Sequence, residues 1–285
     1  MRLTVAQVGD STSVFVVDGE NAINVTSVDA SLGPDLGAIV SGGAAALERV
    51  ATAAAAGASE PLANLNLALP IARPGKVICL GRNYADHAKE GGHEVPDYPS
   101  LFMRGTTSLM AAGAPMIRPN CSERLDYEVE LMVIIGKSGR HISRDAALDH
   151  VFGYTAFNDG SVRDFQRKTA QWTPGKNFDA TGPVGPVVVT PDELPPGAEG
   201  IHVESRLNGQ VMQSATTSDM LFKVPETLAL LSEFTTLEAG DMIAMGTPEG
   251  VGHARTPPVW MKPGDVIEVE IEGIGVIRTP VVAEA

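Results

Sequence analysis

The sequence predicts a folded chain that combines β-strands with fewer helices, in one large domain with a small N-terminal appendage. Its 285 residues are 44% hydrophobic, which is enough to bury a large core. Alternation of apolar and polar residues at 125–136 and 266–272 indicates strands. The alanine-rich run 44–56, which ends at a glycine, and the segment 225–234, with proline in its first turn, indicate helices.

The N-terminal residues carry patterns of structure but none of chemistry. A strand at 14–17 precedes a tight turn, and the helix of 44–56 follows. Prolines and a glycine then interrupt the chain, which places a domain boundary within 58–75. We therefore expect a small N-terminal domain with its linker at 1–69 and a main domain at 70–285.

Composition limits the partners and the location. The formal net charge of −14 makes nucleic acid and anionic membranes poor partners, because both bind through basic surfaces. There is no run of 18 or more apolar residues and the start shows no signal pattern, so we expect a cytoplasmic protein. Cys79 and Cys121 lack a metal-ligand spacing and are expected to be ordinary thiols.

Acidic residues mark the start of the strand at 125–136. Asp126, Glu128 and Glu130 alternate, so they should share one face of the strand. Such carboxylates repel each other unless a cation compensates them, although a solvated acidic face is the simpler alternative. A second strand, 153–160, ends with Asp159. Oxygen ligands of this kind suit hard cations such as Mg²⁺, Mn²⁺ or Ca²⁺.

Four motifs along the chain resemble those of one known family. They are GRNYADH (81–87), DYEVEL (126–131), NDGSVRDFQ (158–166) and GTPEGVG (246–252). In this order they resemble the fumarylacetoacetate hydrolase family in its short form, over roughly 70–282. The resemblance implies an α+β fold built around a mixed β-sheet roll, with a small N-terminal α+β domain, and a homodimer.

The resemblance also implies roles for individual residues. By position the metal ligands are Glu128, Glu130 and Asp159, with Mg²⁺ or Mn²⁺ bound and Ca²⁺ possible in its place. The other implied site residues are catalytic His87, Glu90, Lys176 and Gln166, and substrate-binding Arg82, Tyr84, Arg163 and Thr247. Asp126 would lie just outside the ligand set.

His87 and Glu90 are also a plausible pair on physical grounds. Residues three apart on a helical turn can touch, so the carboxylate can orient the imidazole as a base. A solvated helix face is the alternative reading of this spacing. In the resembling hydrolases such a dyad lies on a lid and activates water, and Gly91-Gly92 would let the segment 84–95 close on substrate.

The sequence also predicts the local structure around Arg163 and Lys176. Ser161-Val162-Arg163-Asp164 resembles a capping box that starts a helix directly after Asp159. Lys176 would lie in a loop.

A second acidic strand serves as a control for the metal-site pattern, and two places in the chain differ from the family's motifs. Glu268, Glu270 and Glu272 repeat the spacing of the proposed ligands without a second acid cluster or base, so we interpret them as a solvated face. The first departure from the family pattern is at 102–109, which reads FMRGTTSL and contains Arg104. The second is at Gly160 and Val162, where the family commonly has Val and Ala. These departures leave the substrate open more than the reaction type.

The resemblance implies chemistry on a small anionic 2-oxo acid. Three carboxylates leave about three of six octahedral metal positions open for such a ligand. Hydrolysis of a carbon–carbon bond in a 3-acylpyruvate, such as fumarylpyruvate or acetylpyruvate, with release of pyruvate, is the first expectation because the His87/Glu90 dyad is intact. Oxaloacetate decarboxylation or isomerisation of a 5-carboxymethyl-2-hydroxymuconate-type diacid is the alternative. A non-catalytic, metal-stabilised organic-acid-binding domain would leave His87, Gln166 and Lys176 unused.

Overall fold

The computed structural model describes residues 1–92 and 94–285, and His93, within the predicted lid segment, lies outside the described residues. The strands are β1 (Arg2–Val8), β2 (Ser11–Asp18), β3 (Asn21–Asn24), β4 (Ser59–Pro61), β5 (Val77–Gly81), β6 (Ser100–Met103), β7 (Leu109–Ala111), β8 (Met116–Arg118), β9 (Leu125–Asp126), β10 (Val129–Ile135), β11 (Val151–Asn158), β12 (Ser161–Val162), β13 (Gly182–Val189), β14 (His202–Leu207), β15 (Gln210–Thr216), β16 (Met242–Ala244), β17 (Val266–Ile271) and β18 (Gly275–Ala283). The α-helices are α1 (Gly37–Ala54), α2 (Ala85–Glu90), α3 (Arg163–Gln166), α4 (Thr173–Lys176) and α5 (Val224–Phe234).

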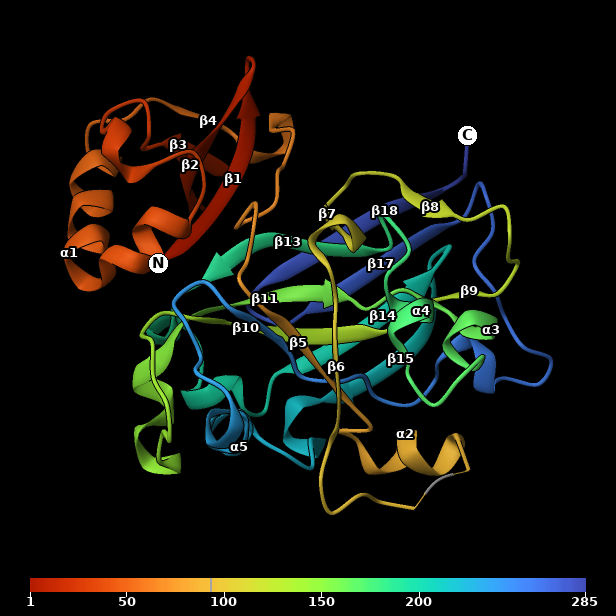
Figure 1. Ribbon diagram of the computed structural model, residues 1–285. Coiled ribbons are helices and arrows are strands. Elements are labelled where there is room, and N and C mark those ends of the chain that lie inside the picture. Colours follow the sequence, from red (N-terminus) through yellow and green to blue (C-terminus); the bar gives the residue numbers. More distant parts are fainter. Residues whose placement is uncertain (93) are drawn as a thin grey trace.

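Two sheets pack against each other and form the body of the protein. The larger sheet has the order β4-β3-β2-β1-β13-β11-β10-β16-β5-β6, with β7 paired to β13, and the smaller one runs β15-β14-β17-β18-β8. Strands β10, β11 and β13 pack on β14, β17 and β18 (Figure 1). Every residue of β10 is buried, as expected for a strand covered on both faces. Parallel and antiparallel pairs occur in both sheets, which confirms the predicted α+β fold with a mixed-sheet roll.

The N-terminal strands extend the larger sheet rather than forming a sheet of their own. Strand β1 pairs with β13, and Leu3 lies opposite Val188. Helix α1 begins at Gly37, earlier than expected, and Gly43 interrupts it with a φ of 57°. The division at residue 69 stays a prediction. Among the described residues, none of the helices is long and apolar enough to cross a membrane.

Two local predictions near the acidic residues were wrong. The segment 125–136 is two strands, β9 and β10, because β9 pairs with β12 whereas β10 pairs with β11 and β16. Ser161 does not cap a helix: it lies in β12, and its hydroxyl donates to the carbonyl oxygen of Asp159. Helix α3 has only four residues and receives no side-chain cap. Asp126 lies in β9 and is not part of the group formed by Glu128, Glu130 and Asp159, as described below.

Candidate active site

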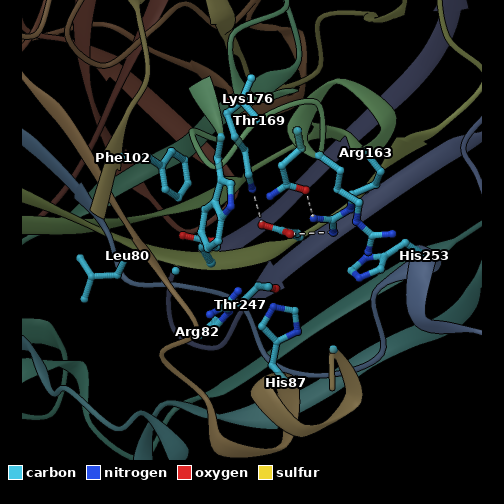
Figure 2. Close-up of a pocket in the computed structure, with 16 residues that line it drawn as sticks. Leu80, Arg82, His87, Phe102, Arg163, Thr169, Lys176, Thr247 and His253 are labelled. Atoms are coloured by element: carbon cyan, nitrogen blue, oxygen red, sulfur yellow. Dashed lines mark hydrogen bonds and ion pairs between the residues drawn. The ribbon is translucent and has the colours of Figure 1, made fainter. Parts of the chain in front are cut away.

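A cavity of about 350 Å³ opens at the end of the larger sheet where β10 and β11 meet α2, α3 and α4. The predicted site residues that line it are Arg82, His87, Glu128, Glu130, Arg163, Gln166, Lys176 and Thr247. Figure 2 shows that His87 reaches the cavity from α2, on the side opposite Lys176. Tyr84 is buried and is not among the lining residues, so its predicted substrate contact stays a prediction.

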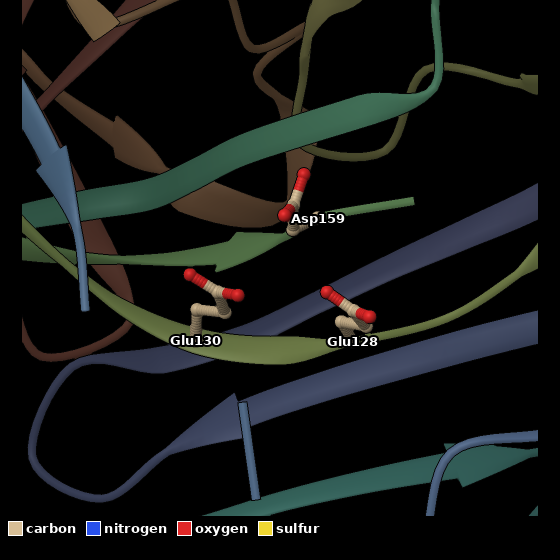
Figure 3. Close-up of side chains that lie close together, drawn as sticks. All are labelled: Glu128, Glu130 and Asp159. Carbon is tan, nitrogen blue, oxygen red and sulfur yellow. The ribbon is translucent and has the colours of Figure 1, made fainter. Parts of the chain in front are cut away.

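The three predicted metal ligands come together where β10 begins and β11 ends, with Glu130 in β10, Glu128 just before it and Asp159 just after β11. In the antiparallel pair β10 and β11, Val129 lies opposite Asn158, which places Asp159 beside Glu128. The backbone N–H of Asp159 donates to the carbonyl oxygen of Glu128 (2.9 Å). One carboxylate oxygen from each of Glu128, Glu130 and Asp159 lies within 4.8 Å of the others (Figure 3), and all three residues are buried.

Buried cations compensate two of these three carboxylates. Nζ of Lys176 donates to Oε2 of Glu128 (2.7 Å) and to Oδ2 of Asp159 (2.6 Å). Nη2 of Arg163 lies 2.7 Å from Oε1 of Glu128, and Arg104 forms an ion pair with Asp159. Burial by itself raises the pKa of Glu128, but Lys176 and Arg163 outweigh it and hold that pKa well below its usual range.

Glu130 is the acid that the protein leaves without a cation among the described residues. Oε2 of Glu130 accepts a hydrogen bond from the backbone N–H of Gly246 (2.9 Å). Burial and the charges of Asp159 and Glu128 raise the pKa of Glu130 well above its usual range. Three buried carboxylates with oxygen donors only, one of them without an ion pair among the described residues, fit a hard divalent cation.

His87 and Glu90 form the predicted dyad. Nδ1 of His87 lies 2.8 Å from Oε1 of Glu90, and Oε2 of Glu90 accepts from the backbone N–H of Gly250 (3.0 Å). An ionised carboxylate only accepts, so Nδ1 carries the proton and Nε2 is left as the basic nitrogen. The contact with Gly250 also fixes α2 against the loop that contains Thr247.

Asp126 fixes a second histidine at the cavity. Its carboxylate is fully buried and accepts from Nε of Arg163 (2.8 Å) and from the backbone N–H groups of Gly252 (2.8 Å) and His253 (3.0 Å). The imidazole of His253 lies 3.2 Å from Oδ2 of Asp126, and His253 lines the cavity beside Arg163 (Figure 2). Burial raises the pKa of Asp126, but Arg163 and His253 reverse this effect and lower it. Asp126 therefore positions Arg163 and His253, and Glu128, Glu130 and Asp159 form the acidic group.

Arg82 stands at the aromatic side of the cavity. Its guanidinium carbon lies 5.5 Å from the ring centroid of Trp172, whose ring makes an edge contact with Phe102. Burial lowers the pKa of Arg82. The backbone of Arg82 has a φ of 61°, in the left-handed region, directly after β5. The cavity thus offers cationic groups for an anionic ligand although the whole chain is acidic.

One position at the cavity, His253, was missed as a site residue from the sequence, whereas Arg104 was among the cations expected to offset an anionic substrate. His253 follows the GTPEGVG motif directly, which was a usable signal. Arg104 belongs to the segment that departs from the family pattern, and it is buried with hydrogen bonds to Ser108 (3.1 Å), Thr181 (2.8 Å) and the carbonyl oxygen of Gly160 (3.1 Å). A Cβ at Gly160 would collide with the carbonyl oxygen of Thr181, so this departure has a steric reason.

The control strand has partners of its own. Arg206 pairs with Glu268 (3.0 Å) and Glu270 (2.7 Å) on β17, away from the cavity. The geometry therefore separates these acids from the buried group at β10 and β11. It defines an α+β protein whose cavity joins an oxygen-ligand cation site to a histidine–glutamate dyad.

Comparison with known proteins places this site in a family. The sequence profile described as fumarylacetoacetate (FAA) hydrolase C-terminal matches residues 76–282, and the chain belongs to this family of enzymes. The mitochondrial oxaloacetate tautomerase fahd2 of Xenopus laevis is 38% identical over 289 residues, which cover 99% of this chain and 90% of that protein. The oxaloacetate tautomerase YisK of Bacillus subtilis is 43% identical over 224 residues, covering 77% of this chain and 74% of YisK.

A solved structure supports the same assignment. The maleylpyruvate hydrolase from Sphingobium sp. SYK-6, in complex with manganese(II) ion and pyruvate, superimposes with a TM-score of 0.85 at 28% identity, covering 100% of both chains. The family resemblance found in the sequence is thereby confirmed. Hydrolysis, the first expectation, is not specifically supported, and the named relatives fit better with the alternative, oxaloacetate decarboxylation or isomerisation of a 2-oxo diacid.

Proposed function

We propose that this protein interconverts the keto and enol forms of a small 2-oxo diacid of the oxaloacetate type, with Mg²⁺ or Mn²⁺ bound. The observation that carries the proposal is the joint placement of the His87/Glu90 dyad and the acidic group of Glu128 and Glu130 around one cavity. The tautomerase names of relatives that align over most of the chain support it.

Different residues would hold the cation and transfer the proton. Glu128, Glu130 and Asp159 would hold the cation, which when bound supplies Lewis-acid polarisation of the keto oxygen. Nε2 of His87 would take the proton from C3, while Glu90 keeps the ring oriented and stabilises its charged form. Delivery of a proton to the former keto oxygen completes enol formation, the reverse sequence gives the keto form, and no water is consumed.

Positive side chains would favour the developing enolate. Lys176 and Arg163 lie at the cavity within ion-pair distance of Glu128, so their charge is fixed in place before substrate binds. Removing one positioned donor to a developing oxyanion typically costs about 2.7 to 4 kcal/mol. Arg82 supplies a further cation for the second carboxylate of a diacid.

Hydrolysis of a 3-acylpyruvate is the second candidate. The observation that favours it is that Nε2 of His87 could instead activate a water molecule at the same cavity. Oxaloacetate decarboxylation would also rely on the bound cation to polarise the keto oxygen, but it would need no attacking nucleophile. The predicted homodimer and the expected lack of nucleic-acid and membrane partners also remain proposals.

One experiment separates these reactions. Purified protein with Mg²⁺ or Mn²⁺ is given enol oxaloacetate, acetylpyruvate or fumarylpyruvate, while enol absorbance and pyruvate are followed together. We expect accelerated loss of oxaloacetate enol without matching pyruvate. Stoichiometric pyruvate from an acylpyruvate, with no effect on oxaloacetate enol, would replace the proposal by hydrolysis.

A further inference from the structure

Gln213 is a buried polar side chain behind the cavity that none of the proposed steps uses. It lies on β15 and is 1% exposed. Its Oε1 accepts from the backbone N–H of Val129 (3.0 Å) and from the hydroxyl of Ser205 (2.9 Å). Its Nε2 donates to Oγ1 of Thr247 (2.7 Å) and to the carbonyl oxygen of Pro248 (2.9 Å).

The orientation of this amide is fixed by groups that cannot change roles. The backbone N–H of Val129 can only donate, so the atom that faces it must be the amide oxygen. The carbonyl of Pro248 can only accept, so the atom that faces it must be the amide nitrogen. A flipped amide would set two donors against each other on one side and two acceptors on the other.

The fixed amide determines the polarity of Thr247. Because Nε2 of Gln213 is a donor, Oγ1 of Thr247 must accept from it, and the hydroxyl proton has to point elsewhere. Among the described residues no protein acceptor is recorded for that proton, while Thr247 lines the cavity. A buried hydroxyl proton without an acceptor is costly, so when the cavity holds a ligand, an acceptor oxygen of that ligand satisfies it.

We propose that Gln213 is a positioning residue that makes the Thr247 hydroxyl an obligatory donor to an acceptor oxygen of the substrate. The inference deepens the proposed function and rests on it, because it takes the organic acid in this cavity as the ligand. The acceptor is a carboxylate or keto oxygen. A ligand that presents only an N–H or O–H donor at this place is selected against, since donor would face donor.

Gln213→Glu reverses the polarity at nearly constant shape. The new carboxyl oxygen beside Thr247 accepts the hydroxyl proton whether the group is ionised or protonated, because a proton on it would go to the carbonyl of Pro248. The Thr247 hydroxyl is then drawn away from the cavity. Affinity for an acceptor ligand should fall by about 10- to 100-fold, the size expected for a hydrogen bond to a charged group.

A double-mutant cycle tests this coupling by calorimetric titration of the Mn²⁺-loaded protein with oxalate. We expect Gln213→Glu and Thr247→Val each to weaken oxalate binding about 10-fold or more, Thr247→Ser to retain it, and Gln213→Glu to add less than about 3-fold in the Thr247→Val background. Gln210→Glu, at an exposed position of the same strand, controls for the added charge and should bind oxalate as the wild type does.

The possible outcomes separate the inference from the proposed function. Additive losses in the cycle would mean that Gln213 acts only on the fold, and would overturn the inference while leaving the proposed function intact. If Gln213→Glu does not fold, the comparison of Thr247→Val with Thr247→Ser decides, and wild-type oxalate affinity in Thr247→Val overturns the inference. No oxalate binding to the Mn²⁺-loaded wild type would overturn both.

Discussion

Replacing Glu130 by glutamine removes one negative charge from the acidic group at almost constant size. Its carboxylate lies within 4.8 Å of those of Glu128 and Asp159, where two unit charges repel by about 3 kcal/mol at an effective dielectric constant of about 20. Lys176 and Arg163 offset part of this for Glu128. Glu130 accepts a hydrogen bond from Gly246 but forms no ion pair among the described residues, so the repulsion acts mainly on Glu130.

Because the pKa of Glu130 is raised, the stability of the metal-free protein should depend on pH. Native metal-free protein binds a proton at Glu130 that the unfolded chain has already lost above pH of about 4.3, so stability falls as pH rises toward the native pKa. The slope approaches about 1.4 kcal/mol per pH unit for one proton. Metal-free Glu130→Gln lacks this term, so its stability relative to wild type should increase as the pH rises above about 4.3.

Glu130→Gln should weaken metal binding, although it raises the relative stability of the metal-free protein. Loss of a ligand should weaken Mn²⁺ binding by at least about 100-fold, since partners outside the ligand set commonly contribute 10- to 100-fold. Urea denaturation across pH and calorimetric Mn²⁺ titration measure the two effects. Glu270→Gln removes one of three acids around the half-buried Arg206, away from the cavity, and should leave Mn²⁺ affinity unchanged. Wild-type Mn²⁺ affinity in Glu130→Gln would refute the reasoning.

Three further predictions concern the residues around the cavity. His87→Ala should slow enol–keto conversion by about 10²-fold or more and Glu90→Ala less, because Glu90 only orients the ring; equal rates in wild type and His87→Ala by enol absorbance would remove the base. Lys176→Met leaves Glu128 and Asp159 without the charge now 2.7 and 2.6 Å away, so urea denaturation of the metal-free protein should show a loss of about 3 to 5 kcal/mol, and an unchanged midpoint would contradict this. Residues 84–92 should exchange amide hydrogens more slowly when oxalate and Mn²⁺ bind, and identical exchange with and without them would count against a lid.

Local sequence signals predicted the elements whose causes are local. Asn208-Gly209, a pair typical of two-residue turns, joins β14 to β15, and both residues adopt the positive φ (52° and 81°) that such a turn requires. Helix α5 likewise begins with a proline in its first turn. Strand alternation predicted that Glu128 and Glu130 share a side, but it grouped Asp126 with them. The family resemblance, and not a local signal, selected the three ligands.

The errors arose where distant segments decide the structure. The predicted continuous strand is broken because β9 pairs with β12, a partner that only the fold brings there. Lys176 was expected in a loop but lies in α4, and its burial follows from the acids that surround it. Arg104 meets Asp159 across 55 positions, and His253 meets Asp126 across 127, so neither contact has a local signal.

Solvent deuterium exchange at C3 of a 2-oxo acid tests most directly whether this cavity moves a carbon-bound proton. Oxaloacetate is incubated in D₂O with protein and Mn²⁺, then the metal is removed by chelation before the spectrum is recorded by NMR. We predict Mn²⁺-dependent exchange with wild type and Glu270→Gln, and at least about 10²-fold slower exchange with His87→Ala. Exchange no faster than with Mn²⁺ alone, or equal exchange in His87→Ala and wild type, would contradict the account.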